Sequence, residues 1–129
     1  MAIVVGYIAT PEGRAALEAA IVEAERRDDR LIVIVHGLRG ADQVEISKTV
    51  DEARDRLDES GVGYDVRHVQ RGNDVSEDLI LTASESRADL IVIGLRRRSP
   101  VGKLILGSNA QRILLDAPCH VLAVKSTQS

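Results

Sequence analysis

Apolar residues recur along this chain in two patterns, one typical of buried strands and the other of amphipathic helices. Short runs that are apolar on both faces occupy residues 3–8, 31–35, 90–93 and 121–124. Their length and composition predict strands covered by helices on both sides. Between these runs, apolar residues return every three or four positions, which is the spacing of a helix with one buried face. The pattern therefore predicts strands and helices in alternation.

One predicted strand differs from the others, because residues 64–69 alternate apolar and polar side chains. Such alternation is typical of a strand at the edge of a sheet. Capping residues and a glycine also predict where several helices begin and end. Thr10 and Pro11 form an N-cap and a first helical residue, Asp74 with Glu77 forms a capping box, and Gly61 is a C-terminal stop.

Each predicted helix has an apolar inner face and a polar outer one. On the second helix, Glu52 and Arg56 have the spacing of an ion pair on the solvent side. The inner faces comprise Leu17, Ala20, Ile21 and Ala24; then Ile46, Val50, Ala53 and Leu57; then Val75, Leu79, Ile80 and Ala83; and finally Ala110, Ile113, Leu114 and Ala117.

Strictly alternating strands and helices imply an α/β fold with a doubly wound, five-stranded parallel sheet. Right-handed crossovers, with the half-polar third strand at one edge, favour the strand order 3-2-1-4-5. In this order the winding direction reverses between strands 1 and 4. A ligand crevice is expected outside the carboxyl ends of these two strands.

The loop that leaves the fourth strand has the features of a phosphate site. The strand ends at Gly94, a basic segment follows, and a helix begins near Gly107 and Ser108 with the latter as N-cap. Backbone N–H groups at a helix start attract anions, and guanidinium groups bind phosphate oxygens in pairs. The cationic side chains of the loop are Arg96, Arg97, Arg98 and Lys103.

The length and composition of the chain favour a single domain and argue against binding to nucleic acid or membrane. The 129 residues suit one domain, 1–129, and carry a net charge of -3, so the basic loop lies in an acidic background. With two Tyr and no Phe or Trp, the chain has almost none of the aromatic residues on which nucleic-acid bases usually stack. Neither a signal peptide nor a run of about 20 apolar residues is present. We expect a cytoplasmic protein that binds neither nucleic acid nor membrane. The lone Cys119 is expected to be a small buried residue.

The C-terminal third has a sequence pattern that continues from Gly94 to Ser108 through Asn109-Ala110-Gln111-Arg112-Ile113-Leu114 and Ala117-Pro118-Cys119. In this pattern, and over essentially the whole chain, the protein resembles the universal stress protein family. The resemblance implies binding of ATP or another adenine nucleotide through a G-x2-G-x9-G-[ST] loop. It also implies a stress-response sensor or adaptor, not a fast enzyme, and a homodimer. We expect an adenine nucleotide or another small phosphate-bearing ligand in the crevice between strands 1 and 4.

The chain departs from the family pattern at two positions. Arg97 replaces the second glycine of the loop, and Ile8 stands where nucleotide-binding members carry an Asp that faces the nucleoside. The alternative is therefore a family member with a degenerate site that acts through dimerisation. The candidate site comprises Ile8, Ala9, Thr10, His36, Gly37, Gly94, Arg96, Arg97, Arg98, Lys103, Gly107, Ser108 and Asn109.

Other interpretations of these residues remain open or are weaker. Gly94, Gly107 and Ser108 also suit a tight strand exit and a helix start without any ligand. The three His residues have no metal-binding spacing, and no catalytic residues are assigned. The last strand, Val121-Leu122-Ala123-Val124, is apolar on both faces yet lies at an edge, which favours a homodimer built around it.

Overall fold

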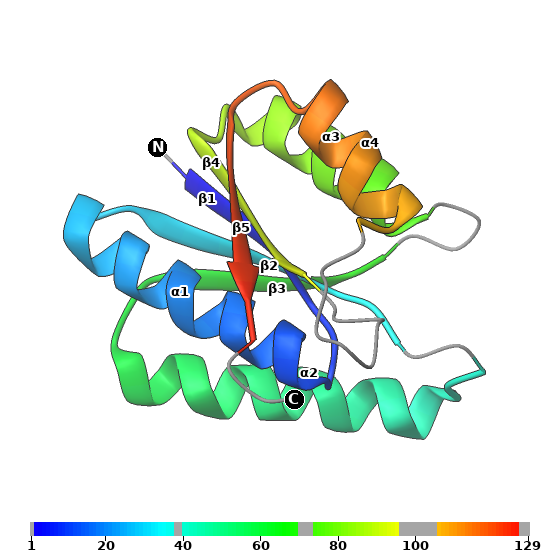
Figure 1. Ribbon diagram of the computed structural model, residues 1–129. Helices are drawn as coiled ribbons and strands as arrows, with labels where there is room; N and C mark the ends of the chain where they lie inside the picture. Colours follow the sequence, from blue (N-terminus) through cyan, green and yellow to red (C-terminus); the bar gives the residue numbers. More distant parts are fainter. Residues whose placement is uncertain (1, 38–39, 70–73, 96–105, 127–129) are drawn as a thin grey trace.

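The computed structural model describes residues 2–37, 40–69, 74–95 and 106–126. It shows the expected alternation of strands and helices around one sheet (Figure 1). The elements are β1 (Ala2–Tyr7), α1 (Pro11–Arg27), β2 (Arg30–Val35), α2 (Gln43–Ser60), β3 (Tyr64–His68), α3 (Val75–Ser86), β4 (Leu90–Leu95), α4 (Ser108–Asp116) and β5 (His120–Lys125).

The sheet has the order β3-β2-β1-β4-β5, as the sequence predicted. All four pairings are parallel, and β1 lies in the middle with Val4 opposite Ile32 of β2 and Ile91 of β4. The winding direction changes between β1 and β4. Their carboxyl ends therefore diverge into connections on opposite faces of the sheet, which leaves room for a site between them.

Alternate residues of the central strands enter two separate cores. Ile3, Val5 and Tyr7 of β1 face α1 and α2, whereas Val4 faces α3 and α4. Figure 1 shows the same division, with α1 and α2 on one side of the sheet and α3 and α4 on the other. Because both faces are covered, the strands are apolar throughout, and this is the origin of the continuous apolar runs in the sequence.

Backbone signals set the helix boundaries largely as expected. Thr10 caps α1, with Pro11 in its first turn, and Asp74 caps α3 by accepting a hydrogen bond from the N–H of Glu77 at 2.8 Å. Gly61 ends α2 in the left-handed conformation, at φ 79°. The predicted cap of the last helix was wrong, because Gly107 and not Ser108 occupies the N-cap position of α4.

Two predictions about helix faces were also wrong. Arg56 does not pair with Glu52 but reaches across to Glu18 of α1, with contacts of 2.5 and 2.7 Å. On α4, Leu114 is 43% exposed and Ile113 is the residue that is buried. A nine-residue helix packed against α3 near the edge of the sheet covers too little surface to bury the four-residue face that was predicted.

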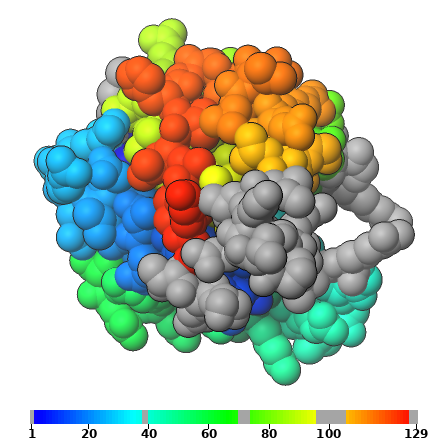
Figure 2. All heavy atoms as spheres, viewed as in Figure 1, coloured from blue at the N-terminus to red at the C-terminus, as the bar shows by residue number. Residues whose placement is uncertain are grey.

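The edge strand β5 is more open than the central strands. Val121, Leu122 and Val124 are half-buried, and Ala123 is exposed. In the space-filling view of Figure 2, β5 in red crosses the surface between α1 in blue and α4 in orange. Within the described parts of the chain, no helix is long and apolar enough to span a membrane.

Candidate functional site

A cavity of about 210 Å³ lies where the sheet ordering predicts a crevice, at the carboxyl ends of β1 and β4. Its walls come from both faces of the sheet and from three helix starts. The lining residues are Gly6, Ile8, Glu12, Gly13, His36, Val75, Leu79, Ile93, Gly94, Leu95, Gly107, Asn109, Ala110 and Ile113. Most are apolar or glycine. Glu12, His36 and Asn109 are the residues with polar or ionisable side chains among them.

Two glycines let the first turn of α1 approach the strand ends. A Cβ on Gly13 would lie 1.9 Å from the main-chain oxygen of Ile8, and one on Gly94 would lie 2.2 Å from that of Glu12. Neither distance is possible for a real side chain. The absence of side chains at these two positions therefore brings β1, β4 and the start of α1 together at the cavity.

The three helices that begin at this cavity differ in how their first N–H groups are satisfied. On α1, the Thr10 hydroxyl accepts from the N–H of Gly13 at 3.1 Å, and Pro11 has no N–H to offer. On α3, the Asp74 carboxylate is the cap, and hydrogen bonding to the Glu77 N–H keeps the pKa of Asp74 below its ordinary value. On α4, no side chain caps the helix and no acid occupies the first turn. The start of α4 is thus the electropositive one.

His36 follows β2 and stands between this cavity and a second one. Its backbone N–H donates to the carbonyl of Tyr7 at 3.0 Å, which holds the residue beside the end of β1. Burial lowers the pKa of the His36 imidazole, so a neutral ring is favoured in this position. A neutral imidazole has one N–H donor and one acceptor nitrogen, which suits hydrogen bonding to a polar ligand.

The second cavity, of about 320 Å³, shares His36 and Val75 with the first. Its remaining lining comes from the ends of β2 and β3 and the start of α2, and comprises Val35, Gly37, Ile46, His68 and Val69. A third cavity, with several charged residues in its lining, lies between α1 and α2. Ala9 and Gly37 contribute to it, together with Arg14, Glu45, Lys48 and Glu52 among others.

The structure brings five of the thirteen predicted site residues to the β1–β4 cavity: Ile8, His36, Gly94, Gly107 and Asn109. The other described candidates lie elsewhere. Ala9 and Gly37 line the neighbouring cavities, Thr10 caps α1, and Ser108 is the exposed first residue of α4. Arg96, Arg97, Arg98 and Lys103 lie outside the described residues.

Sequence reasoning missed several residues of the cavity wall. Leu79, Ile93 and Ile113 were recognised only as core residues, and Glu12 only as an acid in the first turn of a helix. A signal for Glu12 was available. It lies four residues beyond Ile8, in the first turn of a helix that had to start at the end of a central strand, so it could not lie far from the crevice.

Residues 1–125 match the universal stress protein family. A curated universal stress protein of Mycolicibacterium smegmatis is 47% identical over 127 residues, which cover 95% of this chain and 96% of the relative. This chain belongs to the universal stress protein family. The resemblance read from the C-terminal third is therefore confirmed over almost the full length of the chain.

Solved structures of other family members have the same fold. A universal stress protein from Archaeoglobus fulgidus matches with a TM-score of 0.82 and 32% identity, covering 97% of this chain and 98% of that one. Another structure of a universal stress protein from Archaeoglobus fulgidus, in complex with dAMP, matches with a TM-score of 0.78 and 27% identity over 97% and 98% of the two chains.

Proposed function

We propose that this protein binds an adenine nucleotide in the β1–β4 cavity and acts as a nucleotide-responsive sensor or adaptor. The observation that carries the proposal is the uncapped start of α4, which opens into a cavity at the point where the sheet winding reverses. A family relative of the same fold holds dAMP. Both the local chemistry and the relative support a ligand that has a phosphate group.

The phosphate is assigned to the side of the cavity formed by β4 and α4. Gly94 ends β4 and Gly107 precedes α4, and residues 96–105 connect these two elements. The free N–H groups in the first turn of α4 include those of Asn109 and Ala110, both of which line the cavity. Such a helix start favours a phosphate through its N–H groups and its positive dipole end. The guanidinium groups of Arg96, Arg97 and Arg98 are proposed to add charge-assisted hydrogen bonds.

The base is assigned to the opposite side, towards His36. Small-molecule sites usually measure about 300–1,000 Å³, and the β1–β4 cavity, at about 210 Å³, falls short of that range. The adjoining cavity beyond His36 and Val75 adds about 320 Å³. A nucleotide that extends from Gly107 past Ile8 to His36 would use both spaces, with the ribose at the middle of the crevice.

Titration calorimetry tests the proposal. Adenosine, AMP, ADP and ATP should bind with affinity that rises with the number of phosphates, and the binding should weaken as salt is added. Mass spectrometry of the denatured protein would identify any nucleotide that copurifies. Affinities that are indifferent to both phosphate number and ionic strength would contradict the assignment of the phosphate to α4 and the basic loop.

We also propose that the protein is a binder with, at most, slow ATP hydrolysis. Phosphoryl transfer requires a positioned metal ion and a residue that orients the attacking water. Within the described wall of the cavity, Glu12 is the carboxylate available for either role. Phosphate release faster than about 1 per second, the low end of ordinary enzyme turnover, would contradict this part of the proposal.

For assembly, we propose a homodimer in which β5 of one copy lies against β5 of another. The support is the open edge of β5, where half-buried Val121, Leu122 and Val124 flank an exposed Ala123. An apolar edge with free backbone groups is prone to pair with a second strand. Pairing would cover the edge without changing the sheet order.

A further inference from the structure

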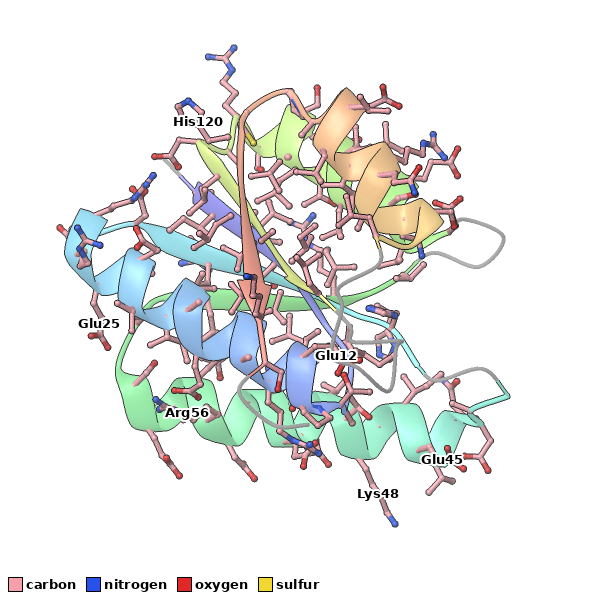
Figure 3. The ribbon with its side chains drawn as sticks, viewed as in Figure 1. Glu12, Glu25, Glu45, Lys48, Arg56 and His120 are labelled. Carbon is pink, nitrogen blue, oxygen red and sulfur yellow. The ribbon has the colours of Figure 1, made fainter. Side chains whose placement is uncertain are left out.

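Glu12 is the acidic residue among the described lining of a cavity whose other walls are mainly apolar. Its Cβ would lie 3.2 Å from a Cβ built on Gly94, so the side chain leaves the backbone directly beside the end of β4. Figure 3 labels Glu12 at the start of α1, near the region where the strands end. Ile8, which lines the same cavity, has no polar side-chain atom.

The described residues also provide no hydrogen-bond or ion-pair partner for the Glu12 carboxylate, although a cation lies nearby in the sequence. Arg14 is directed instead to Glu52 of α2, at 3.7 Å. A carboxylate accepts hydrogen bonds from water or from the hydroxyl and amino groups of a ligand.

The charge of Glu12 also sets which part of a nucleotide lies next to it. A carboxylate repels a phosphate, and it lies at the one helix start of the cavity where a proline and a threonine cap leave few N–H groups for an anion. The phosphate belongs at the uncapped start of α4. A neutral hydrogen-bond donor is therefore expected to face Glu12. Because the base is assigned to the side of His36, the donors that remain in a nucleotide are the ribose hydroxyls.

Resting on the proposed nucleotide binding, we infer that Glu12 is a specificity-determining residue that accepts hydrogen bonds from the ribose hydroxyls. The two carboxylate oxygens match the two vicinal hydroxyls of a ribonucleotide, as acidic residues do at the ribose of dinucleotide sites. The site is then selective for ribose over sugars that lack these hydroxyls. The acid comes from the first turn of α1, four residues after the position of Ile8.

The simplest other role of Glu12 is that of a first-turn acid that stabilises the positive end of α1. Glu45 offers a matched control, because it is the first-turn acid of α2 and lies outside the β1–β4 cavity. Figure 3 shows Glu45 at the start of α2, on the lower helix of the view. A purely structural role predicts the same behaviour for the two residues, whereas ribose recognition predicts an effect at Glu12 alone.

The test is the ratio of affinities for AMP and 2′,3′-dideoxy-AMP, measured by calorimetry on the full chain. The contribution of the phosphate group to the binding free energy is the same for both ligands, so it cancels in the ratio. For the wild-type protein and for Glu45→Gln we expect AMP to bind about tenfold tighter or more, because losing hydrogen bonds to a charged acceptor costs at least that factor. In Glu12→Ala the ratio should approach one, and in the isosteric Glu12→Gln it should fall to an intermediate value.

The outcomes separate this inference from the proposed function. If the wild-type protein binds AMP but the ratio is the same in Glu12→Ala, or is already close to one in the wild type, the role of Glu12 is refuted and nucleotide binding stands. If the wild type binds neither these ligands nor ATP, the proposed function fails, and the inference with it. If it binds ATP but not AMP, the same ratio is measured with ATP and 2′,3′-dideoxy-ATP. Should Glu12→Ala prove unfolded by circular dichroism, an unchanged ratio in folded Glu12→Gln refutes the inference.

Discussion

Gly94 and Glu12 approach so closely that a Cβ on Gly94 would lie 2.2 Å from the main-chain oxygen of Glu12. This contact joins the end of β4 to the first turn of α1 and so forms one wall of the β1–β4 cavity. The glycine is needed here for packing whether or not a ligand is bound. The same backbone approach thus provides close packing and shapes the cavity in which we propose that a nucleotide binds.

Gly94→Ala should therefore destabilise the protein. The added methyl group has to push α1 away from β4, and such overpacking costs about 1–3 kcal/mol. Gly63→Ala is the control, because a Cβ there would meet its nearest atom, Nη1 of Arg30, at an ordinary 3.6 Å. Urea unfolding of both variants measures the difference in the free energy of unfolding. Equal stabilities of the two variants would show that the contact is not as tight as described.

Neighbouring residues on α4 should differ sharply in their contribution to stability. Ile113 is 2% exposed and packs in the core between α3, α4 and the sheet, so Ile113→Ala should cost about 2–5 kcal/mol. Arg112 lies 3.5 Å from Asp74 and 3.8 Å from Glu77, with its side chain 43% exposed. Because such pairs are screened by solvent, Arg112→Gln should leave the free energy of unfolding nearly unchanged. The opposite ranking in urea unfolding would mean that ion pairs, not packing, hold α4 in place.

The sequence predicted the fold well because its strongest signals are local and repeated. The apolar runs, the caps at Thr10 and Asp74 and the stop at Gly61 each constrain a few residues, and together they define the α/β order. The half-polar strand correctly marked the β3 edge. Predictions failed where a contact depends on how two elements are placed. Arg56 pairs with Glu18, 38 residues away, and no local spacing reveals that contact.

The site could be predicted only in outline. Strand ends predicted the location of the crevice, and Ile8, His36 and Gly94 do lie there. The close approach of α1 to β4, which brings Glu12 to the cavity, depends on Gly13 and Gly94 acting together across 81 positions of the sequence. Nothing in the pattern around either glycine indicates its partner.

The stability of the protein should decrease in mildly acidic solution because of His36. Burial lowers the pKa of His36 below its ordinary value of 6.5, so the unfolded state binds the proton more readily than the folded state. The free energy of unfolding should then fall as the pH drops from about 6.5 towards the pKa of the folded state. The pKa of Asp74 is also lowered, but protonation of this carboxylate reduces the free energy of unfolding only as the pH falls below the ordinary pKa of 3.8.

Urea unfolding measured at several pH values between about 7.5 and 5 should show this loss of stability as a fall in the unfolding midpoint. His36→Gln should reduce the loss of stability over that range. The exposed edge-strand residue His68 provides a control for the removal of an imidazole as such, through His68→Gln. An unchanged pH dependence in His36→Gln would assign the acid sensitivity to another group.

The proposed dimer predicts a clear effect of a charge on β5. Ala123 is exposed in the middle of the strand, so Ala123→Lys should keep the fold but place a cation in the pairing edge. Light scattering should give twice the chain mass of 14.0 kDa for the wild type and the single mass for the variant. A wild-type protein that is monomeric at micromolar concentration, or a variant that remains dimeric, would rule out this edge as the interface.

Nuclear magnetic resonance of the ¹⁵N-labelled protein during titration with AMP tests most directly whether the β1–β4 cavity binds a nucleotide. The backbone amides of Gly94, Gly107 and Ala110 should shift in a saturable way, because they lie on the cavity wall or at the start of α4. Amides at the amino ends of the strands, such as those of Leu31 in β2 and Tyr64 in β3, belong to residues that line neither this cavity nor the adjoining one and should keep their chemical shifts. Saturable shifts confined to residues 41–52, beside the cavity between α1 and α2, or no shifts at all, would contradict nucleotide binding between β1 and β4.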